Sequence, residues 1–170
     1  MGMLGCALVY VGFVLFINGI WLIGILDDKH VIPMNVFTGL LIFAGVMRTV
    51  VLQGEGITSY FYGMQSLLFA FTYLWVAINI IWNLEGKGLG WFCLLVAVTA
   101  LPTAFTTFPD IGLFILWLMW ASLWFMFFLL LGLGKNIGKA TGAWTVVNAV
   151  ATGVAGYLIL IKAWPWLPTT

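Results

Sequence analysis

Three tryptophans are the side chains whose type and spacing most directly suggest chemistry. Trp117, Trp120 and Trp124 stand at i, i+3 and i+7, which places them within roughly a 60° arc of one helical face. They lie in the middle of an apolar run, where each indole N–H needs a hydrogen-bond partner that lipid tails do not provide. The rings therefore either line a lumen that carries a polar permeant, or pack against other helices with the N–H bonded to a neighbouring carbonyl.

Two further stripes at helical spacing add a few neutral polar groups. Phe69, Thr72 and Tyr73 share one face of a predicted helix. An earlier segment repeats apolar residues at 4-3-4-3 spacing and ends in an amide, as Leu4, Leu8, Val11, Leu15 and Asn18. Together with the tryptophans, these stripes predict a narrow slot with aromatic and aliphatic walls. Such a slot cannot replace the hydration shell of an ion, but it would pass a flat, neutral, dipolar molecule such as urea or acetamide.

Motifs for catalysis or metal binding are missing from the sequence. It contains no GxSxG, no HExxH, no phosphate-binding loop and no pair of carboxylates placed for acid–base work. His30 follows two aspartates in a polar stretch, which is typical of a solvated loop residue rather than a ligand. Cys6 and Cys93 lie far apart in apolar runs, as small packing residues do. We therefore predict that the chain is not an enzyme and holds no metal or cofactor.

The composition indicates a protein whose outer surface faces lipid. Of the 170 residues, 64% are hydrophobic and only 6% are charged, whereas about 25% of a soluble domain is charged. The mean hydropathy of +1.18 agrees with this. A net charge of +1 gives no reason to expect a nucleic-acid partner.

Charged residues and Gly or Pro clusters divide the chain into six apolar runs. Each is close to the roughly 20 residues that a helix needs to cross a hydrocarbon core of about 30 Å. The expected helices are 3–26, 32–53, 59–82, 89–108, 111–133 and 142–163. The predicted fold is therefore an all-α integral membrane protein, a six-transmembrane-helix bundle formed by a single domain over residues 1–170.

The distribution of basic residues predicts an orientation in the membrane. Four lysines fall in the connections after the first, third and fifth helices: Lys29, Lys87, Lys135 and Lys139. Only Arg48 and Lys162 lie toward the other side. By the positive-inside rule, the side with four lysines is cytoplasmic, which places both termini outside.

Small and aromatic residues predict packing faces and interfacial belts. In lipid, close backbone approach at small residues is a main source of helix association. The first and last helices carry such residues as Gly5, Gly12, Gly19, Ala149, Gly153 and Gly156. Tryptophans at helix ends are typical of the belts at the headgroup level. They are Trp21, Trp82, Trp91, Trp164 and Trp166.

The segments that carry these stripes also resemble a known family. LLFAFTYLWVAIN (67–79), GLGWFCLLVAVTALP (88–102) and LWLMWASLWFMFFLLLGLG (116–134) look like the AmiS/UreI family of urea channels and short-chain amide transporters. The N-terminal LVYVGFVLFINGIW (8–21) is similar to the first helix of that family. The likeness spans nearly the whole chain.

The resemblance implies a function and an assembly. It implies passive, bidirectional permeation of urea and small amides through a pore inside each protomer, with six protomers in a ring in the bacterial cytoplasmic membrane. It also implies a functional link to an intracellular amidase or urease. The constrictions would be built by the stripe residues named above, to which the resemblance adds Leu123 on the fifth helix.

Two departures from the family pattern bear on acid gating. Acid-gated members carry a long, His-rich outer loop between the second and third helices, whereas this chain has only Gly54-Glu55-Gly56 there. Those members also place a carboxylate in the sixth helix at the position that matches Asn148. Because protonation gating at mildly acidic pH needs histidines, we expect a channel that is not acid-gated.

Two other classes of function compete with a passive channel. An ion-coupled carrier of small amides usually needs an ionisable residue at membrane depth, and every acidic residue here lies in or beside a predicted loop. A structural membrane subunit without a pore of its own would leave the stripes as packing surfaces.

Overall fold

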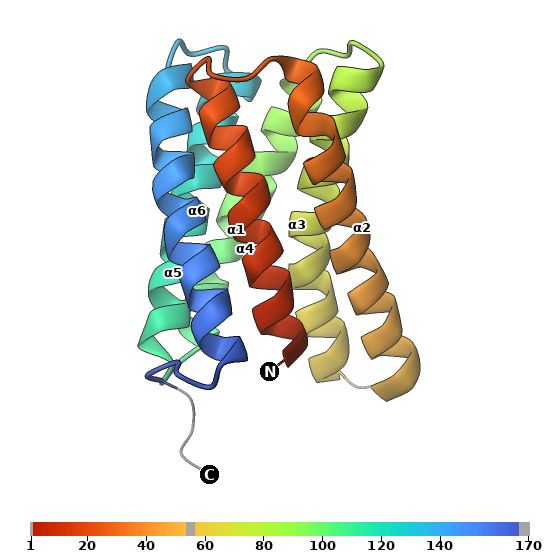
Figure 1. Ribbon diagram of the computed structural model, residues 1–170, viewed down its shortest axis with the longest axis vertical. Helices are drawn as coiled ribbons and strands as arrows, with labels where there is room; N and C mark the ends of the chain where they lie inside the picture. Colours follow the sequence, from red (N-terminus) through yellow and green to blue (C-terminus); the bar gives the residue numbers. More distant parts are fainter. Residues whose placement is uncertain (1, 54–56, 167–170) are drawn as a thin grey trace.

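The computed structural model describes residues 2–53 and 57–166, which contain six helices of membrane-spanning length and composition. They are α1 (Gly2–Leu22), α2 (Asp28–Gln53), α3 (Ile57–Ile81), α4 (Lys87–Thr106), α5 (Ile111–Phe127) and α6 (Gly138–Leu160), with a short π-helix, η1 (Phe128–Gly132), continuing α5. They run alternately up and down in Figure 1, so the start of α1 and the end of α6 lie at the same, lower end. The predicted six-helix architecture is confirmed.

Several helix boundaries differ from the expected ones for local reasons. α2 begins at Asp28 rather than at 32, with a carboxylate in the first turn, where the helix dipole favours negative charge. α6 begins at Gly138, so Lys139 lies in its first turn and not in a loop. The fifth helix ends in wider turns, in which the Leu133 N–H donates to the Phe128 carbonyl at 3.1 Å. The expected short connection Gly54-Glu55-Gly56 lies outside the described residues.

Glycines let the backbones of α1 and α6 touch. A β-carbon added at Gly12 would lie 2.6 Å from the Gly153 α-carbon and 3.0 Å from the Ala149 carbonyl oxygen. The same close approach recurs toward both ends of the interface, where Gly5 meets Gly156 and Gly19 meets Gly142. The predicted packing faces of small residues on these two helices are confirmed. This contact fixes the rotation of α1, and thereby the direction of its seam of Leu8, Val11 and Leu15.

A second backbone contact joins η1 to α4. A β-carbon at Gly90 would overlap the backbone of Gly132, so Gly90 has no room for a larger residue. A β-carbon at Gly132 would instead meet the Phe128 ring, at 2.8 Å. Leu89 and Cys93, which flank Gly90 on α4, are buried at 3% and 1% exposure. The widened turn of η1 therefore lies directly against the part of α4 that turns these two side chains inward.

The two facing glycines of the α1–α6 interface should respond differently to alanine. Gly12→Ala would place a methyl group against backbone atoms that cannot move independently, and overpacking of this kind costs about 1–3 kcal/mol. A β-carbon at Gly153 meets only the Gly12 α-carbon, at an ordinary 3.7 Å. We expect Gly12→Ala to lower the thermal midpoint of the detergent-solubilised protein by several degrees and Gly153→Ala to leave it unchanged. Equal midpoints for the two variants would contradict the described register of α1 against α6.

Candidate functional site

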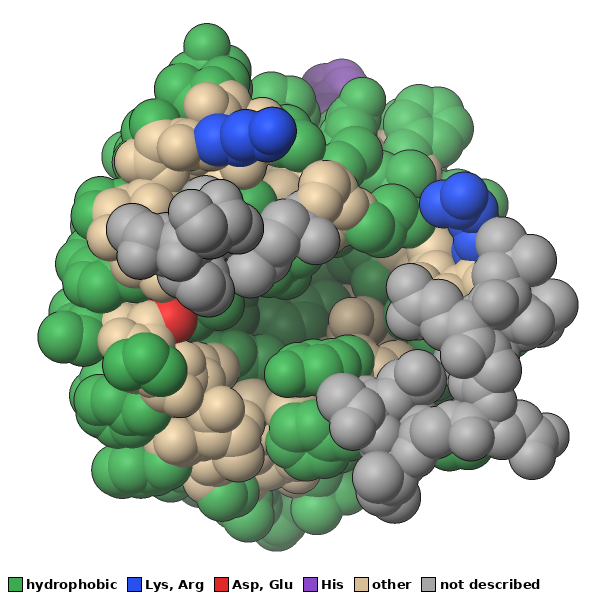
Figure 2. All heavy atoms as spheres, turned by 90° about the horizontal axis from the view of Figure 1, so that it is seen from below, with side chains coloured by type: hydrophobic (Ala, Val, Ile, Leu, Met, Phe, Trp, Pro, Cys, Tyr) green, Lys and Arg blue, Asp and Glu red, His purple; other side chains and the backbone are tan. Residues whose placement is uncertain are grey.

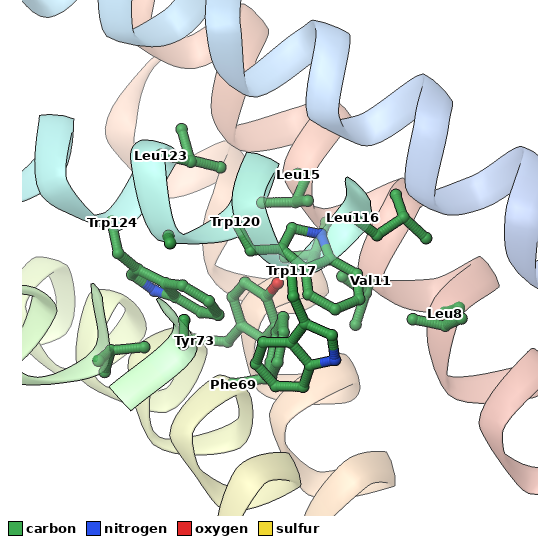
Figure 3. Close-up of a cluster of buried hydrophobic side chains, with 14 of the residues drawn as sticks. Leu8, Val11, Leu15, Phe69, Tyr73, Leu116, Trp117, Trp120, Leu123 and Trp124 are labelled. Atoms are coloured by element: carbon green, nitrogen blue, oxygen red, sulfur yellow. The ribbon is translucent and has the colours of Figure 1, made fainter. Parts of the chain in front are cut away.

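Phe69 on α3 and three tryptophans of α5 form an aromatic cluster inside the bundle (Figure 3). The ring centroids of Trp117, Trp120 and Trp124 lie 5.8, 5.0 and 4.6 Å from that of Phe69, with interplanar angles of 70°, 86° and 70°. Edge-to-face contacts at these distances are the arrangement that aromatic quadrupoles prefer. Phe69 therefore packs against all three tryptophans of the stripe and joins α3 to α5 through ring contacts.

A cavity of about 30 Å³ lies next to this cluster, between α1, α3, α4 and α5. Eight of the residues predicted from the sequence line it: Leu15, Asn18, Phe69, Thr72, Tyr73, Trp120, Leu123 and Trp124. The other lining residues are Trp21, Val76, Leu89, Cys93 and Phe127. This volume has room for roughly two water molecules. Every lining side chain is uncharged, and most of them are apolar.

Phe69 and Trp120 of the aromatic cluster form the aromatic floor of the cavity, beside Leu15. Because α1, α3 and α5 all run upward in Figure 1, the lowest lining residue on each helix is Leu15, Phe69 and Trp120 respectively. Below them lie Leu8, Val11 and Trp117, which are predicted site residues that do not reach the cavity and are buried at 4%, 2% and 7% exposure. The view from below in Figure 2 shows a hollow in the lower end of the bundle, with hydrophobic side chains on its walls. The floor residues lie on the side of the cavity that is nearer to this lower end of the bundle.

Two predicted site residues lie elsewhere. Leu4 is 38% exposed near the start of α1. Asn148 on α6 is completely buried and does not line the cavity. Its Nδ2 donates to the Trp144 carbonyl at 2.9 Å, while its Oδ1 has no hydrogen-bond partner within the described part of the chain. A buried amide oxygen without a donor is uncommon and marks the α6 face beside α5 as polar.

The N–H of Trp120 bonds within the protein and does not face a lumen. Its Nε1–H donates to the Thr152 hydroxyl oxygen on α6 at 3.0 Å, and both residues are buried. Trp120 therefore follows the alternative interpretation, except that the partner is a hydroxyl and not a carbonyl. Among the described residues, the Nε1–H groups of Trp117 and Trp124 have no hydrogen-bond acceptor.

The polar groups of α1 and α3 in the cavity wall are largely occupied by other protein groups. Asn18 and Asn35 exchange two hydrogen bonds, of 3.0 and 2.7 Å, across α1 and α2. Asn35 also donates to the Val31 carbonyl at 2.9 Å. The Thr72 hydroxyl donates to the Leu68 carbonyl at 2.7 Å. The neutral amide in the wall is thus locked in position, which keeps a buried polar group from being left without partners.

Leu89, Cys93 and Trp21 line the cavity but were missed as site residues. Leu89 and Cys93 are four residues apart on α4, a spacing shared by any buried helical face. Trp21 was assigned to an interfacial belt, yet it lines the cavity while its Nε1–H donates to Asp28 Oδ1 at 2.8 Å. The glycine beside Leu89, Gly90, was the only local signal of a close helix contact in this region.

The predicted tryptophan belt also needs a second correction. Trp164 is only 8% exposed, because it packs on Gly112 and its Nε1–H donates to Asp110 Oδ2 at 2.9 Å. Asp110 Oδ1 accepts the Leu113 N–H at the start of α5. Trp82 and Trp91 are 66% and 49% exposed, as residues of an outer belt should be.

Comparison with known proteins identifies the relatives of this bundle. The sequence model of the AmiS/UreI family of transporters matches residues 3–163 of this chain. The chain belongs to this family. It is 44% identical to a putative amidate substrates transporter protein of Mycolicibacterium smegmatis, over 94% of this chain and 78% of that protein. It is 29% identical to the acid-activated urea channel of Helicobacter pylori, over 95% of this chain and 100% of that protein.

Solved structures agree with the sequence relatives. The crystal structure of the urea channel from Helicobacter pylori superimposes on this AmiS/UreI chain with a TM-score of 0.86, covering 95% of this chain and 99% of that one at 29% identity. The described helices therefore follow the fold of a membrane channel, and the chain is an integral membrane protein of a transporter family rather than an enzyme.

Substitutions in the aromatic cluster should alter permeation more than substitutions in the outer belt. Trp120→Ala and Trp124→Ala each remove a ring from the cavity wall, whereas Trp82→Ala changes a side chain that is 66% exposed at the outside of the bundle. We expect the first two variants to change urea and water permeability, and the ratio between them, severalfold in proteoliposomes, with Trp82→Ala close to wild type. Trp21 and Trp164 are unsuitable controls because of the contacts described above. Unchanged flux in all three variants would mean that the α5 rings are packing residues.

Proposed function

We propose that this protein is a passive channel for urea and short-chain aliphatic amides, with the path running through each protomer between α1, α3 and α5. The observation that carries the proposal is the small cavity with uncharged walls above a floor of edge-to-face aromatic rings. The names of the relatives support the same class of permeant, since one is a putative amidate substrates transporter and another a urea channel.

The chemistry of the walls suits planar amides and excludes ions. A cation or anion entering this cavity would lose its water shell and meet no charged or carbonyl-lined site to replace it. A planar amide can lie between aromatic faces while its carbonyl oxygen accepts from the Trp124 N–H or the Tyr73 hydroxyl. These are wall donors for which the described residues supply no acceptor. An ion-coupled mechanism usually needs an acidic or basic residue at this depth, and no Asp, Glu, Lys, Arg or His lines the cavity.

The proposal includes an orientation and an assembly. The upper end carries Lys29, Lys87, Lys135 and Lys139, against Arg48 and Lys162 toward the lower end. The positive-inside rule then places the upper end in the cytoplasm and both termini outside a bacterial cytoplasmic membrane. The family resemblance supports a ring of six protomers and a partner amidase or urease that consumes the permeant.

Flux in proteoliposomes tests the proposed function. We expect liposomes containing the purified protein to equilibrate urea and acetamide much faster than protein-free liposomes, with the same rate after ionophores collapse proton and sodium gradients, and without ion conductance in planar bilayers. Loss of uptake with ionophores would identify a coupled carrier. Rates equal to those of protein-free liposomes would identify a subunit without a pore. A saturable ionic current would contradict the uncharged path.

External pH should have little effect on this flux. His30 is the one histidine of the sequence and lies at the upper end, on the proposed cytoplasmic side. Carboxylates in model peptides titrate at about pH 4, below the range of the experiment. We expect urea permeability to change less than about twofold between about pH 7.5 and about pH 5, because no histidine is available on the outer side to switch charge in this range. Stopped-flow measurements with the internal pH clamped provide the check. A severalfold rise on acidification would show that gating does not require the His-rich loop.

A further inference from the structure

The bond between Trp120 and Thr152 has a geometry that bears on how the floor of the cavity works. The Nε1–H of Trp120 donates to Thr152 Oγ1 at 3.0 Å, which links α5 to α6. Thr152 has no exposed surface and Trp120 is 3% exposed. A buried indole N–H is costly to leave without an acceptor, so this bond strongly favours one orientation of the ring.

Aromatic neighbours hold the rest of the same indole. Phe69 and Trp117 each lie 5.0 Å from Trp120 between ring centroids, at interplanar angles of 86° and 81°. These contacts limit tilting of the ring but do not distinguish the direction of its N–H edge, because rings attract each other through many weak carbon contacts. The hydrogen bond to Thr152 supplies that direction. With the N–H turned to α6, Trp120 can present only carbon atoms to the cavity whose floor it forms.

We infer that Thr152 is a positioning residue for permeation: its hydroxyl holds the Trp120 N–H away from the path and thereby keeps the floor apolar. The inference rests on the proposed function. Thr152 does not line the cavity and acts only through Trp120. Without the acceptor, the indole turns its N–H toward the cavity, where water can bond to it. The floor then becomes more polar and less rigid, and it admits water more easily relative to urea.

α6 supplies a matched control for this role. Thr145 is also completely buried on α6, but its hydroxyl donates to the Thr141 carbonyl of the same helix at 2.7 Å. Such a bond to the preceding turn is the common behaviour of threonine in membrane helices. The substitution of valine for threonine keeps the side-chain shape at both positions. At Thr145 it removes a bond within one helix, whereas at Thr152 it removes the acceptor of the floor indole.

Urea and water permeabilities of single variants in proteoliposomes test the inference. We expect Thr152→Val to lower the ratio of urea to water permeability by about two- to tenfold, the range set by loss of one buried hydrogen bond. Thr152→Ser keeps a hydroxyl and should retain the wild-type ratio, as should Thr145→Val. If Thr152→Val does not yield folded protein, Thr152→Ala removes the same hydroxyl without adding a methyl group, and the inference requires the same fall. A wild-type ratio in either hydroxyl-free variant, or an equal fall in Thr145→Val, overturns it.

A double-variant comparison asks whether Thr152 acts through Trp120. Trp120→Phe removes the N–H donor, so Thr152→Val added to Trp120→Phe should change the ratio no further. An undiminished effect of Thr152→Val in that background would show that Thr152 influences permeation by another route and would reject the inference. Absence of urea permeability in the wild-type protein is a separate result, which rejects the proposed channel itself.

Discussion

The backbone contact between α1 and α6 is the constraint on which the interior of this bundle depends. Lipid tails are as apolar as leucine side chains, so helices in a membrane associate through close packing and polar bonds instead of the hydrophobic effect. At Gly12 the two helices lie so close together that a β-carbon added there would overlap backbone atoms of α6. With one side of α6 committed to α1, its threonines and Asn148 turn toward the interior. Thr152 thereby reaches α5 and becomes the acceptor for the floor indole.

Several polar side chains inside the bundle pair with one another, since the membrane provides no water to satisfy them. Asn18 and Asn35 pair with each other, Trp120 pairs with Thr152, and Gln65 donates to Thr103 at 3.3 Å. Each pair joins two different helices, and the hydrogen bond between its members occupies groups that could otherwise bind a permeant. The wall that remains is apolar apart from a few donors, which is the surface that a carbonyl-bearing neutral molecule can use and an ion cannot.

The helices, the glycine faces and the tryptophan stripe could be predicted from the amino-acid pattern. In lipid, every spanning segment must satisfy its own backbone hydrogen bonds, so apolar runs of sufficient length become helices. The glycine faces of α1 and α6 were recognisable because close approach requires small residues at helical spacing. The stripe of Trp117, Trp120 and Trp124 was recognisable because three indole rings on one helical face at mid-membrane depth need hydrogen-bond partners that lipid does not provide.

The tertiary structure decided which polar groups meet inside the bundle. Helical periodicity determines the face of each helix but not its partner, so the pattern could not show that Asn18 meets Asn35 or that the Trp120 N–H is taken by Thr152. For the same reason Leu89 and Cys93 were not predicted, because the spacing of residues on α4 does not show which of its faces turns toward the cavity. Trp21 and Trp164, expected in a belt, are instead held by Asp28 and Asp110 from other elements.

The sequence by itself determined six membrane helices and their small and aromatic faces, because those follow from local spacing and from lipid as the solvent. Only the packing of helices distant in sequence decided which side chains enclose the cavity and which way their donors point, because that depends on groups brought together from separate parts of the chain.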